Sequence, residues 1–148
     1  MAGIVLYPLT VFYDASCSMC ASEMHAIKRL DREGRILLVD CSTADFDDAA
    51  LVGGGYCRID AMTLIHARDA GGRWLVGLDV FEAAYRAAGL DLIARFWGNR
   101  RLRPLLDRMY PWVARHRQAL SRFGLDLLVR LVMAAAIFRA SVSAARPR

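Results

Sequence analysis

Two short apolar runs, Leu9–Tyr13 and Ile36–Asp40, flank a segment with helical periodicity, and this arrangement constrains the fold of the 148-residue chain most strongly. Each run is short and rich in aliphatic, β-branched or aromatic residues, which is typical of a buried strand. Between them, Cys20, Met24 and Ile27 recur on one stripe of a helix. A strand, a crossover helix and a second strand within about 30 residues form a βαβ unit, so we expect parallel strands.

Two thiols, Cys17 and Cys20, lie where the first strand leads into the helix, which we expect Ser16 to cap and Gly34 to end. The free N–H groups and the positive dipole end of a helix stabilise a thiolate there, and the thiolate is the attacking species in disulfide exchange. We therefore expect Cys17 to be the more exposed nucleophile with a lowered pKa. Cys20, one turn later, is expected to face inward and to resolve the mixed disulfide.

Other interpretations of this pair stay open. The two thiols could form half of a metal site, or they could be a non-catalytic pair. Asp14, three residues before Cys17, is a candidate catalytic residue that orients the loop or accepts a proton from the resolving thiol. Its structural alternative, which we favour, is an Asx-type turn at the corner between strand and helix.

The predicted topology also bears on the other two cysteines. Cys41 follows the second strand, and Cys57 precedes a predicted third strand that runs antiparallel, so all four cysteines could gather at one sheet edge. Such a cluster would supply a third redox thiol or a four-sulfur metal site. We favour the alternative that Cys41 and Cys57 fill core as small apolar residues. His25 is expected at the surface, and His66 is expected to be structural.

The remaining pattern completes one small domain and a helical extension. We expect a short helix over Thr43–Leu51, and then a hairpin whose strands Met62–Ala67 and Trp74–Val76 flank the turn Asp69–Gly72. A further helix over Val80–Ala88 is expected to be capped by Asp79 and ended by Gly89. This order resembles that of a thioredoxin-like α/β domain with a small mixed four-stranded sheet, βαβ followed by β-hairpin-α, over residues 1–90.

Residues 91–148 are expected to form a helical extension that packs on or next to this core. Its predicted helices span Leu92–Trp97, Leu102–Arg117 and Leu125–Ala140. Pro104 lies near the start of the second of these helices, and Pro111 within it is expected to kink or split it.

Charge is distributed unevenly along the chain. The net charge is +5, yet residues 1–90 carry 12 acids and 8 bases, whereas residues 91–148 carry 3 acids and 12 arginines. We favour a solvated basic face and expect no nucleic-acid partner. A second hypothesis is a non-catalytic interaction module whose basic helical tail contacts a partner or, peripherally, a membrane surface. The apolar residues of the tail are expected rather to pack on the module itself: Leu127, Leu128, Leu131, Val132 and Ala135.

Hydrophobic residues make up 56% of the chain, but no run reaches the 18 or so apolar residues of a membrane span. The N-terminus has neither the charged region nor the cleavage site of a secretory leader, so we expect a cytoplasmic location. Thiols stay reduced there, and a Cys-x-x-Cys pair is then more often catalytic than structural.

Over roughly residues 9–120, the chain resembles the DCC family of thiol-disulfide oxidoreductases. The resemblance rests first on Val11–Asp14 with Cys17 and Cys20, and then on later matches in register: Met62, His66, Ala70–Arg73, Gly77–Phe81 and Tyr110–Arg117. It implies a thioredoxin-like fold and a dithiol oxidoreductase that carries Asp14, Cys17 and Cys20 as its motif. The resemblance does not define the substrate; we expect a disulfide-containing protein or a small thiol, and no cofactor or metal.

Two positions depart from the related patterns. Ala15 stands where the family usually has glycine, and alanine would be strained there if the position required a positive φ. Thioredoxins proper carry a proline just before the third strand, whereas Asp60–Met62 are expected to fill that place here. Both departures concern the loops around the thiols.

Overall fold

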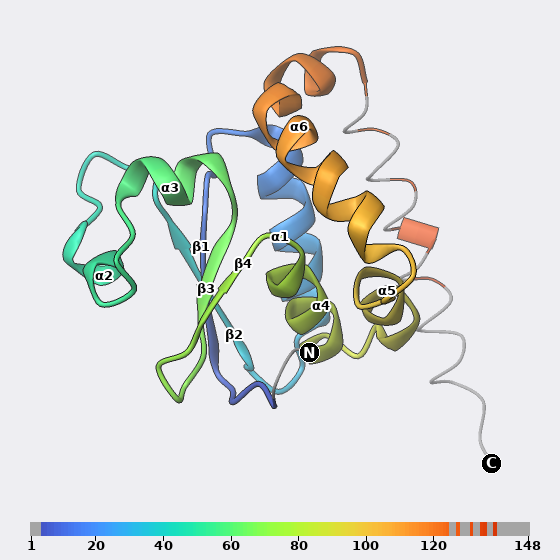
Figure 1. Ribbon diagram of the computed structural model, residues 1–148, viewed down its shortest axis with the longest axis horizontal. Coiled ribbons are helices and arrows are strands. Elements are labelled where there is room, and N and C mark those ends of the chain that lie inside the picture. Colours follow the sequence, from blue (N-terminus) through green and yellow to red (C-terminus); the bar gives the residue numbers. More distant parts are fainter. Residues whose placement is uncertain (1–3, 125–126, 128–130, 132–133, 136–137, 139–148) are drawn as a thin grey trace.

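A mixed four-stranded sheet forms the centre of the computed structural model, which describes residues 4–124, 127, 131, 134, 135 and 138 (Figure 1). The strands lie in the order β2-β1-β3-β4, with β1 parallel to β2, antiparallel to β3, and β3 antiparallel to β4. Their bounds are Leu9–Tyr13 for β1, Ile36–Asp40 for β2, His66–Arg68 for β3 and Trp74–Val76 for β4. The parallel βαβ unit and the hairpin are thus confirmed, and the fold is α/β and thioredoxin-like.

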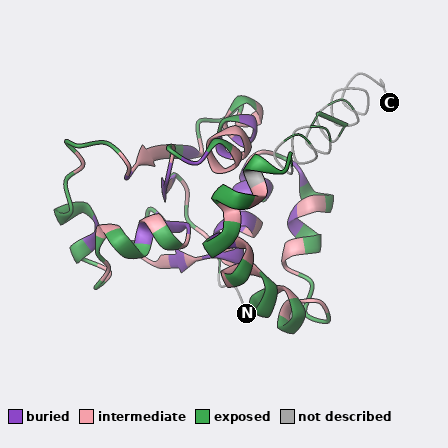
Figure 2. Ribbon diagram, turned by 90° about the horizontal axis from the view of Figure 1, so that it is seen from above, coloured by how far each residue is buried: buried purple, intermediate pink, exposed green. Residues whose placement is uncertain are grey.

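Helices cover both faces of this sheet. Figure 1 shows α1, α4, α5 and α6 on one side of the sheet and α2 and α3 on the other. The helices span Ser18–Leu30 (α1), Ala49–Val52 (α2), Arg58–Thr63 (α3), Leu78–Ala87 (α4), Asp91–Trp97 (α5) and Arg103–Arg122 (α6). Seen from above in Figure 2, the buried residues follow the strands and the inner faces of these helices.

Side-chain alternation along β1 divides the interior into two cores. Leu9, Val11 and Tyr13 belong to a large core that also contains Met24 of α1 and most of α4. Phe12 points the other way, into a smaller core beneath α2 and α3 with Cys41, Leu51 and Ala61. The central strand is therefore fixed from both faces, and its carboxyl end has a defined position.

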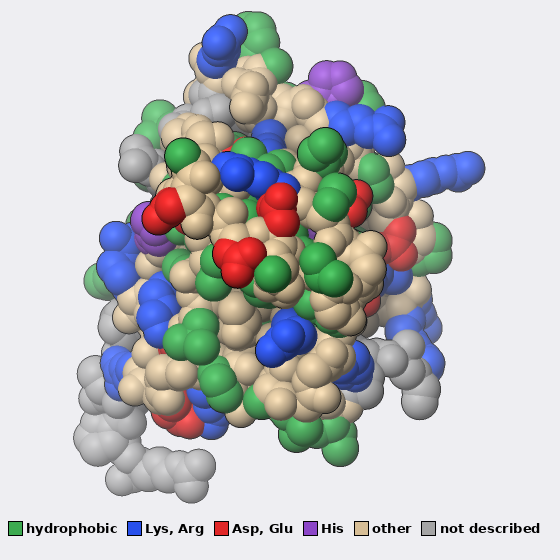
Figure 3. Space-filling model, turned by 90° about the vertical axis from the view of Figure 1, so that its left-hand side faces the viewer, with side chains coloured by type: hydrophobic (Ala, Val, Ile, Leu, Met, Phe, Trp, Pro, Cys, Tyr) green, Lys and Arg blue, Asp and Glu red, His purple; other side chains and the backbone are tan. Residues whose placement is uncertain are grey.

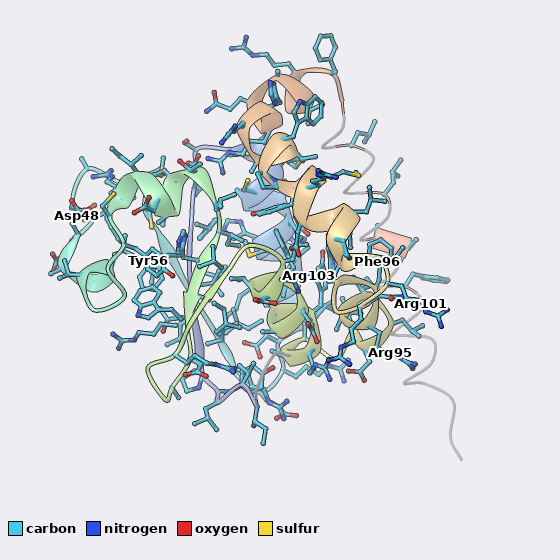
Figure 4. The ribbon with its side chains drawn as sticks, in the orientation of Figure 1. Asp48, Tyr56, Arg95, Phe96, Arg101 and Arg103 are labelled. Atoms are coloured by element: carbon cyan, nitrogen blue, oxygen red, sulfur yellow. The ribbon has the colours of Figure 1, made fainter. Side chains whose placement is uncertain are left out.

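One ionic contact ties the long helix α6 to α4, and a second lies within α6. Arg103, labelled in Figure 4, contacts Asp79 at 2.8 Å and Asp107 at 2.8 Å. The helix continues through Pro111, so the prediction that this proline splits it is wrong. The rest of the helical tail predicted over Leu125–Ala140 lies outside the described residues, apart from 127, 131, 134, 135 and 138, and Leu127 and Leu131 are exposed.

Two predicted elements differ from the structure near the smaller core. Helix α3 occupies Arg58–Thr63, although the sequence pattern predicts Met62 in a strand. The reason is local capping, because the Cys57 backbone N–H donates to Asp60 Oδ2 at 2.9 Å and so starts a helical turn. Only Ala49–Val52 of the helix expected over 43–51 is helical. The place just before β3 is accordingly filled by Leu64 and Ile65, not by Asp60–Met62.

The outer surface shows two further features. On the described part of the face that carries α2 and α3, acidic, basic and apolar side chains are interspersed (Figure 3). No helix in the described part of the chain combines the length and the apolar character that crossing a bilayer requires.

Candidate active site

The corner between β1 and α1, residues 14–17, is held by the carboxylate of Asp14. Its Oδ1 accepts hydrogen bonds from the Ser16 backbone N–H at 3.0 Å and from Ser16 Oγ at 2.5 Å. Because the first bond closes an Asx turn, the structural role expected for Asp14 is confirmed. Ser16 is thereby used within the corner, and Cys17, not Ser16, occupies the N-cap position of α1.

The corner has no backbone strain at its unusual alanine. No non-glycine residue in the described part of the chain has a positive φ, so Ala15 adopts an ordinary backbone conformation. Its N–H donates to Asp40 Oδ1 at 3.1 Å, which attaches the corner to the end of β2. The glycine usual in the family is therefore not required for this geometry.

The two thiols form a closely coupled pair. Cys17 and Cys20 lie 3.0 Å apart. The pKa of Cys17 is lowered to about 6, chiefly by a hydrogen bond from the Cys20 side chain and also by the Cys20 backbone and the charge of Arg117, against the opposing effects of burial and of Asp14. The pKa of Cys20 is raised, first by its side-chain hydrogen bond to Cys17 and then by burial. One sulfur thus holds the negative charge while the other keeps the proton.

Exposure of the two sulfurs differs from the sequence expectation. Cys17 is only 2% exposed, whereas Cys20 is half-buried and lines a cavity. The prediction that Cys17 is the more exposed thiol is therefore wrong. Cys17 lies at the N-cap of α1 within the folded corner, and the Arg117–Asp14 pair joins α6 to that corner. Cys20 does face inward, but toward a cavity.

Arg117 is a site residue that local sequence patterns did not single out. Its Nη2 lies 2.5 Å from Asp14 Oδ2 and also donates to the carbonyl oxygen of Met62. The pair joins residues 103 positions apart, and both side chains are largely buried. The only sequence signal for Arg117 was its place in the Tyr110–Arg117 match to the family.

Glu23 is a second such residue, one helical turn after Cys20 on α1. Tyr85 of α4 donates its hydroxyl to Glu23 Oε1 at 2.5 Å. Burial raises the pKa of Glu23, although the side chain keeps partial exposure because it opens onto the same cavity as Cys20. Its three-residue spacing from Cys20, which places both on one helix face, was the signal available in the sequence.

The cavity beside Cys20 has a volume of about 200 Å³. Its walls come from the end of β1 and from α1, α3, α4, α5 and α6, and the apolar side chains that line it include Met19, Phe81, Trp97 and Tyr110. The ring of Phe81 stacks on Trp97 with centroids 5.5 Å apart and meets Tyr110 edge-on at 5.7 Å. The thiol of the site therefore faces a preformed aromatic space.

Cys41 and Cys57 do not join the pair in a metal-binding cluster. Among the described residues, which include all four cysteines, no group of three or more His, Cys, Asp and Glu side chains could hold a metal ion. Cys41 is fully buried in the smaller core, where burial raises its pKa to about 11, so its predicted role in the core is confirmed. Cys57 is exposed at the start of α3, and the same prediction is wrong for it.

The histidines lie where the sequence places them. His25 is exposed, with its Nε2 3.1 Å from the Tyr13 hydroxyl. His66 is buried, its Nδ1 lies 2.8 Å from the Leu64 carbonyl oxygen, and its ring meets that of Tyr56 edge-on at 4.4 Å. Both contacts of His66 are structural.

Comparison with known proteins agrees with this geometry. The family model described as DCC1-like thiol-disulfide oxidoreductase matches residues 11–123, which run from β1 through the end of α6. No curated protein and no solved structure matches the chain. Since the match covers most of the chain and includes the corner, the thiol pair and Arg117, this protein belongs to the DCC1-like thiol-disulfide oxidoreductase family.

Proposed function

We propose that this protein is an enzyme that exchanges its Cys17–Cys20 dithiol with a disulfide in a protein or small-molecule substrate. One observation carries the proposal: Cys17 and Cys20 lie 3.0 Å apart, and the hydrogen bond from Cys20 is the main cause of the lowered Cys17 pKa of about 6. At neutral pH Cys17 is then mostly thiolate, the form that attacks disulfides. The family implies a thiol or disulfide substrate.

The reaction proceeds in two exchanges. Cys17 thiolate attacks one substrate sulfur, a Cys17–substrate disulfide forms, the substrate disulfide breaks, and the second substrate sulfur leaves as a thiolate that takes a proton from water. Cys20 then loses its proton and attacks the Cys17 sulfur. The Cys17–Cys20 disulfide forms and the first substrate sulfur leaves. The protein loses two electrons and the substrate gains them; the reverse sequence oxidises a dithiol.

The second exchange needs an acceptor for the Cys20 proton, because burial raises the pKa of this thiol even after the Cys17 thiolate has been consumed. We assign this role to Glu23, which opens onto the same cavity and lies one turn from Cys20. Its raised pKa brings its proton affinity closer to that of a thiol, which makes the transfer less unfavourable. Asp14 acts as a positioning residue, through the Asx turn and through Arg117.

A cytoplasmic location is part of the proposal. It is consistent with a catalytic Cys-x-x-Cys pair, since such pairs in reducing compartments are more often catalytic than structural.

A redox titration in glutathione buffers tests the proposal. The background is Cys57→Ser, because Cys57 is exposed and away from the pair, and serine suits its N-cap position. We expect one disulfide to form reversibly, which mass spectrometry detects as the loss of two hydrogen atoms. This disulfide should not form when Cys17→Ser or Cys20→Ser is added. If Cys17 and Cys20 stay reduced across the glutathione range, the proposed function is wrong.

A further inference from the structure

Small side chains create the cavity beside Cys20. Ala61 of α3 and Ala114 of α6 line it with single methyl groups, and both are buried. The aromatic wall of Phe81, Trp97 and Tyr110 lines the same cavity. An apolar cavity of about 150 Å³ stays free of water and binds benzene, so the 200 Å³ found here suits a group of that size or somewhat larger.

The polar groups at the cavity are already used. Arg117 pairs with Asp14, and Glu23 accepts a hydrogen bond from Tyr85. A charged ligand group would have to displace these contacts, whereas an uncharged apolar group would only cover the aromatic wall. The cavity therefore favours a neutral, apolar occupant.

We propose that this cavity receives an aromatic or branched apolar group carried next to the sulfur of the substrate. The inference rests on the proposed function and adds a substrate class to it. Cys20 lines the cavity and Cys17 lies 3.0 Å from Cys20, so a group seated here carries its own sulfur close to both thiols. The exchange chemistry is that given above; the apolar group sets which disulfides react efficiently.

Two pairs of substrates test this preference. The first pair is the disulfide dimers of acetyl-Phe-Cys-amide and acetyl-Ala-Cys-amide. The second pair is the mixed disulfides of mercaptoethanol with phenylethanethiol and with ethanethiol. The natural substrate is either a peptide, like the first pair, or a small molecule, like the second. Within the pair that resembles it, we expect the reduced protein to react about tenfold faster or more with the aromatic member, because apolar pockets change rates by about this factor between such groups. The pair that shows the larger ratio tells whether peptides or small molecules are the source.

Ala114→Leu fills the cavity, and Ala119→Leu is its matched control because Ala119 is exposed on the same helix and lines no part of the cavity. The aromatic preference should fall to near unity in Ala114→Leu and persist in Ala119→Leu. Urea unfolding checks that each variant is folded, and the control Ala119→Leu should react with the ethyl disulfide as the wild type does.

Indole supplies a readout without sulfur chemistry. At millimolar concentration it should raise the unfolding temperature of the wild type and of Ala119→Leu, but not of Ala114→Leu. Equal rates for aromatic and aliphatic disulfides would overturn the inference and leave the proposed function standing. Failure to react with any of the four disulfides would overturn the proposed function and the substrate class together, whatever indole does.

Discussion

Glu23 has the position of a proton acceptor, and its removal should affect one step only. In Glu23→Gln the Tyr85 hydrogen bond can remain, but the side chain no longer accepts the Cys20 proton. We expect the mixed disulfide on Cys17 to accumulate because its resolution slows by about a hundredfold, while attack by Cys17 is little changed. Rapid acid quenching and mass spectrometry measure both steps.

Glu33→Gln is the matched control, because Glu33 is exposed and pairs with Arg35 at the surface. An unchanged rate of resolution in Glu23→Gln would remove the carboxylate from the mechanism.

Arg117 acts on the thiols through its charge, and on the fold through Asp14. Arg117→Met should raise the pKa of Cys17 above about 6, because the cation that favours its thiolate is lost. It should also lower the free energy of unfolding by about 3 kcal/mol, since a buried carboxylate is left without its cation. The pH dependence of iodoacetamide alkylation, measured in the Cys57→Ser background, and urea unfolding give the two quantities.

Arg115→Met controls for loss of charge alone, because Arg115 is exposed on the same helix. A Cys17 pKa that is the same in Arg115→Met and Arg117→Met would contradict the assigned role of the guanidinium.

At the scale of elements, the junction of β4 and α4 depends on a glycine. Gly77 has φ 61°, and a Cβ there would lie 3.1 Å from Cε1 of Tyr110, which lines the cavity. Gly77→Ala should cost about 1–3 kcal/mol of stability, because alanine is strained at φ 61° and ψ −122°, plus the displacement of the tyrosine ring. Urea unfolding measures the loss.

Gly34→Ala separates these two effects. Gly34 has φ 65°, and no atom lies within 4 Å of the place that an alanine methyl group would take, so only the backbone cost applies there. Equal losses of unfolding free energy in the two variants would show that moving the Tyr110 ring costs no stability.

Elements formed by local patterns were predictable, and contacts between distant elements were not. The runs Leu9–Tyr13, Ile36–Asp40 and Trp74–Val76 are strands within the predicted bounds because turn or helix signals flank each of them. Helix α3 was missed because its capping by Asp60 outweighs the strand-like character of Met62. The thiol pair and Asp14 were found from spacing, but the partner of Asp14 is Arg117, 103 residues later, which no local pattern reveals.

For the whole molecule, the lowered pKa of Cys17 links stability to pH. Between about 6 and the ordinary thiol value of 9.0, the folded, reduced protein binds fewer protons at Cys17 than the unfolded chain does, so stability rises with pH. The stabilisation is present above the unfolded pKa and is lost as pH falls through about 6. We expect the difference in free energy of unfolding between the reduced wild type and Cys17→Ser to increase by at most about 1.4 kcal/mol per pH unit across this window.

Urea unfolding of both proteins under a reducing agent from pH 5 to pH 9 measures this difference. A difference that stays constant with pH would show that Cys17 titrates alike in the folded and unfolded chains.

The bond between Arg117 and Asp14 also sets an order of events during synthesis. A ribosome releases the thiol pair early, together with β1 and α1, whereas Arg117 and the α6 wall of the cavity emerge about 100 residues later. Until then, the nascent chain carries two cysteines without the cation that lowers their pKa and without the cavity beside them. The growing polypeptide is therefore a weaker thiol nucleophile than the finished protein, which limits unwanted exchange with its neighbours before folding is complete.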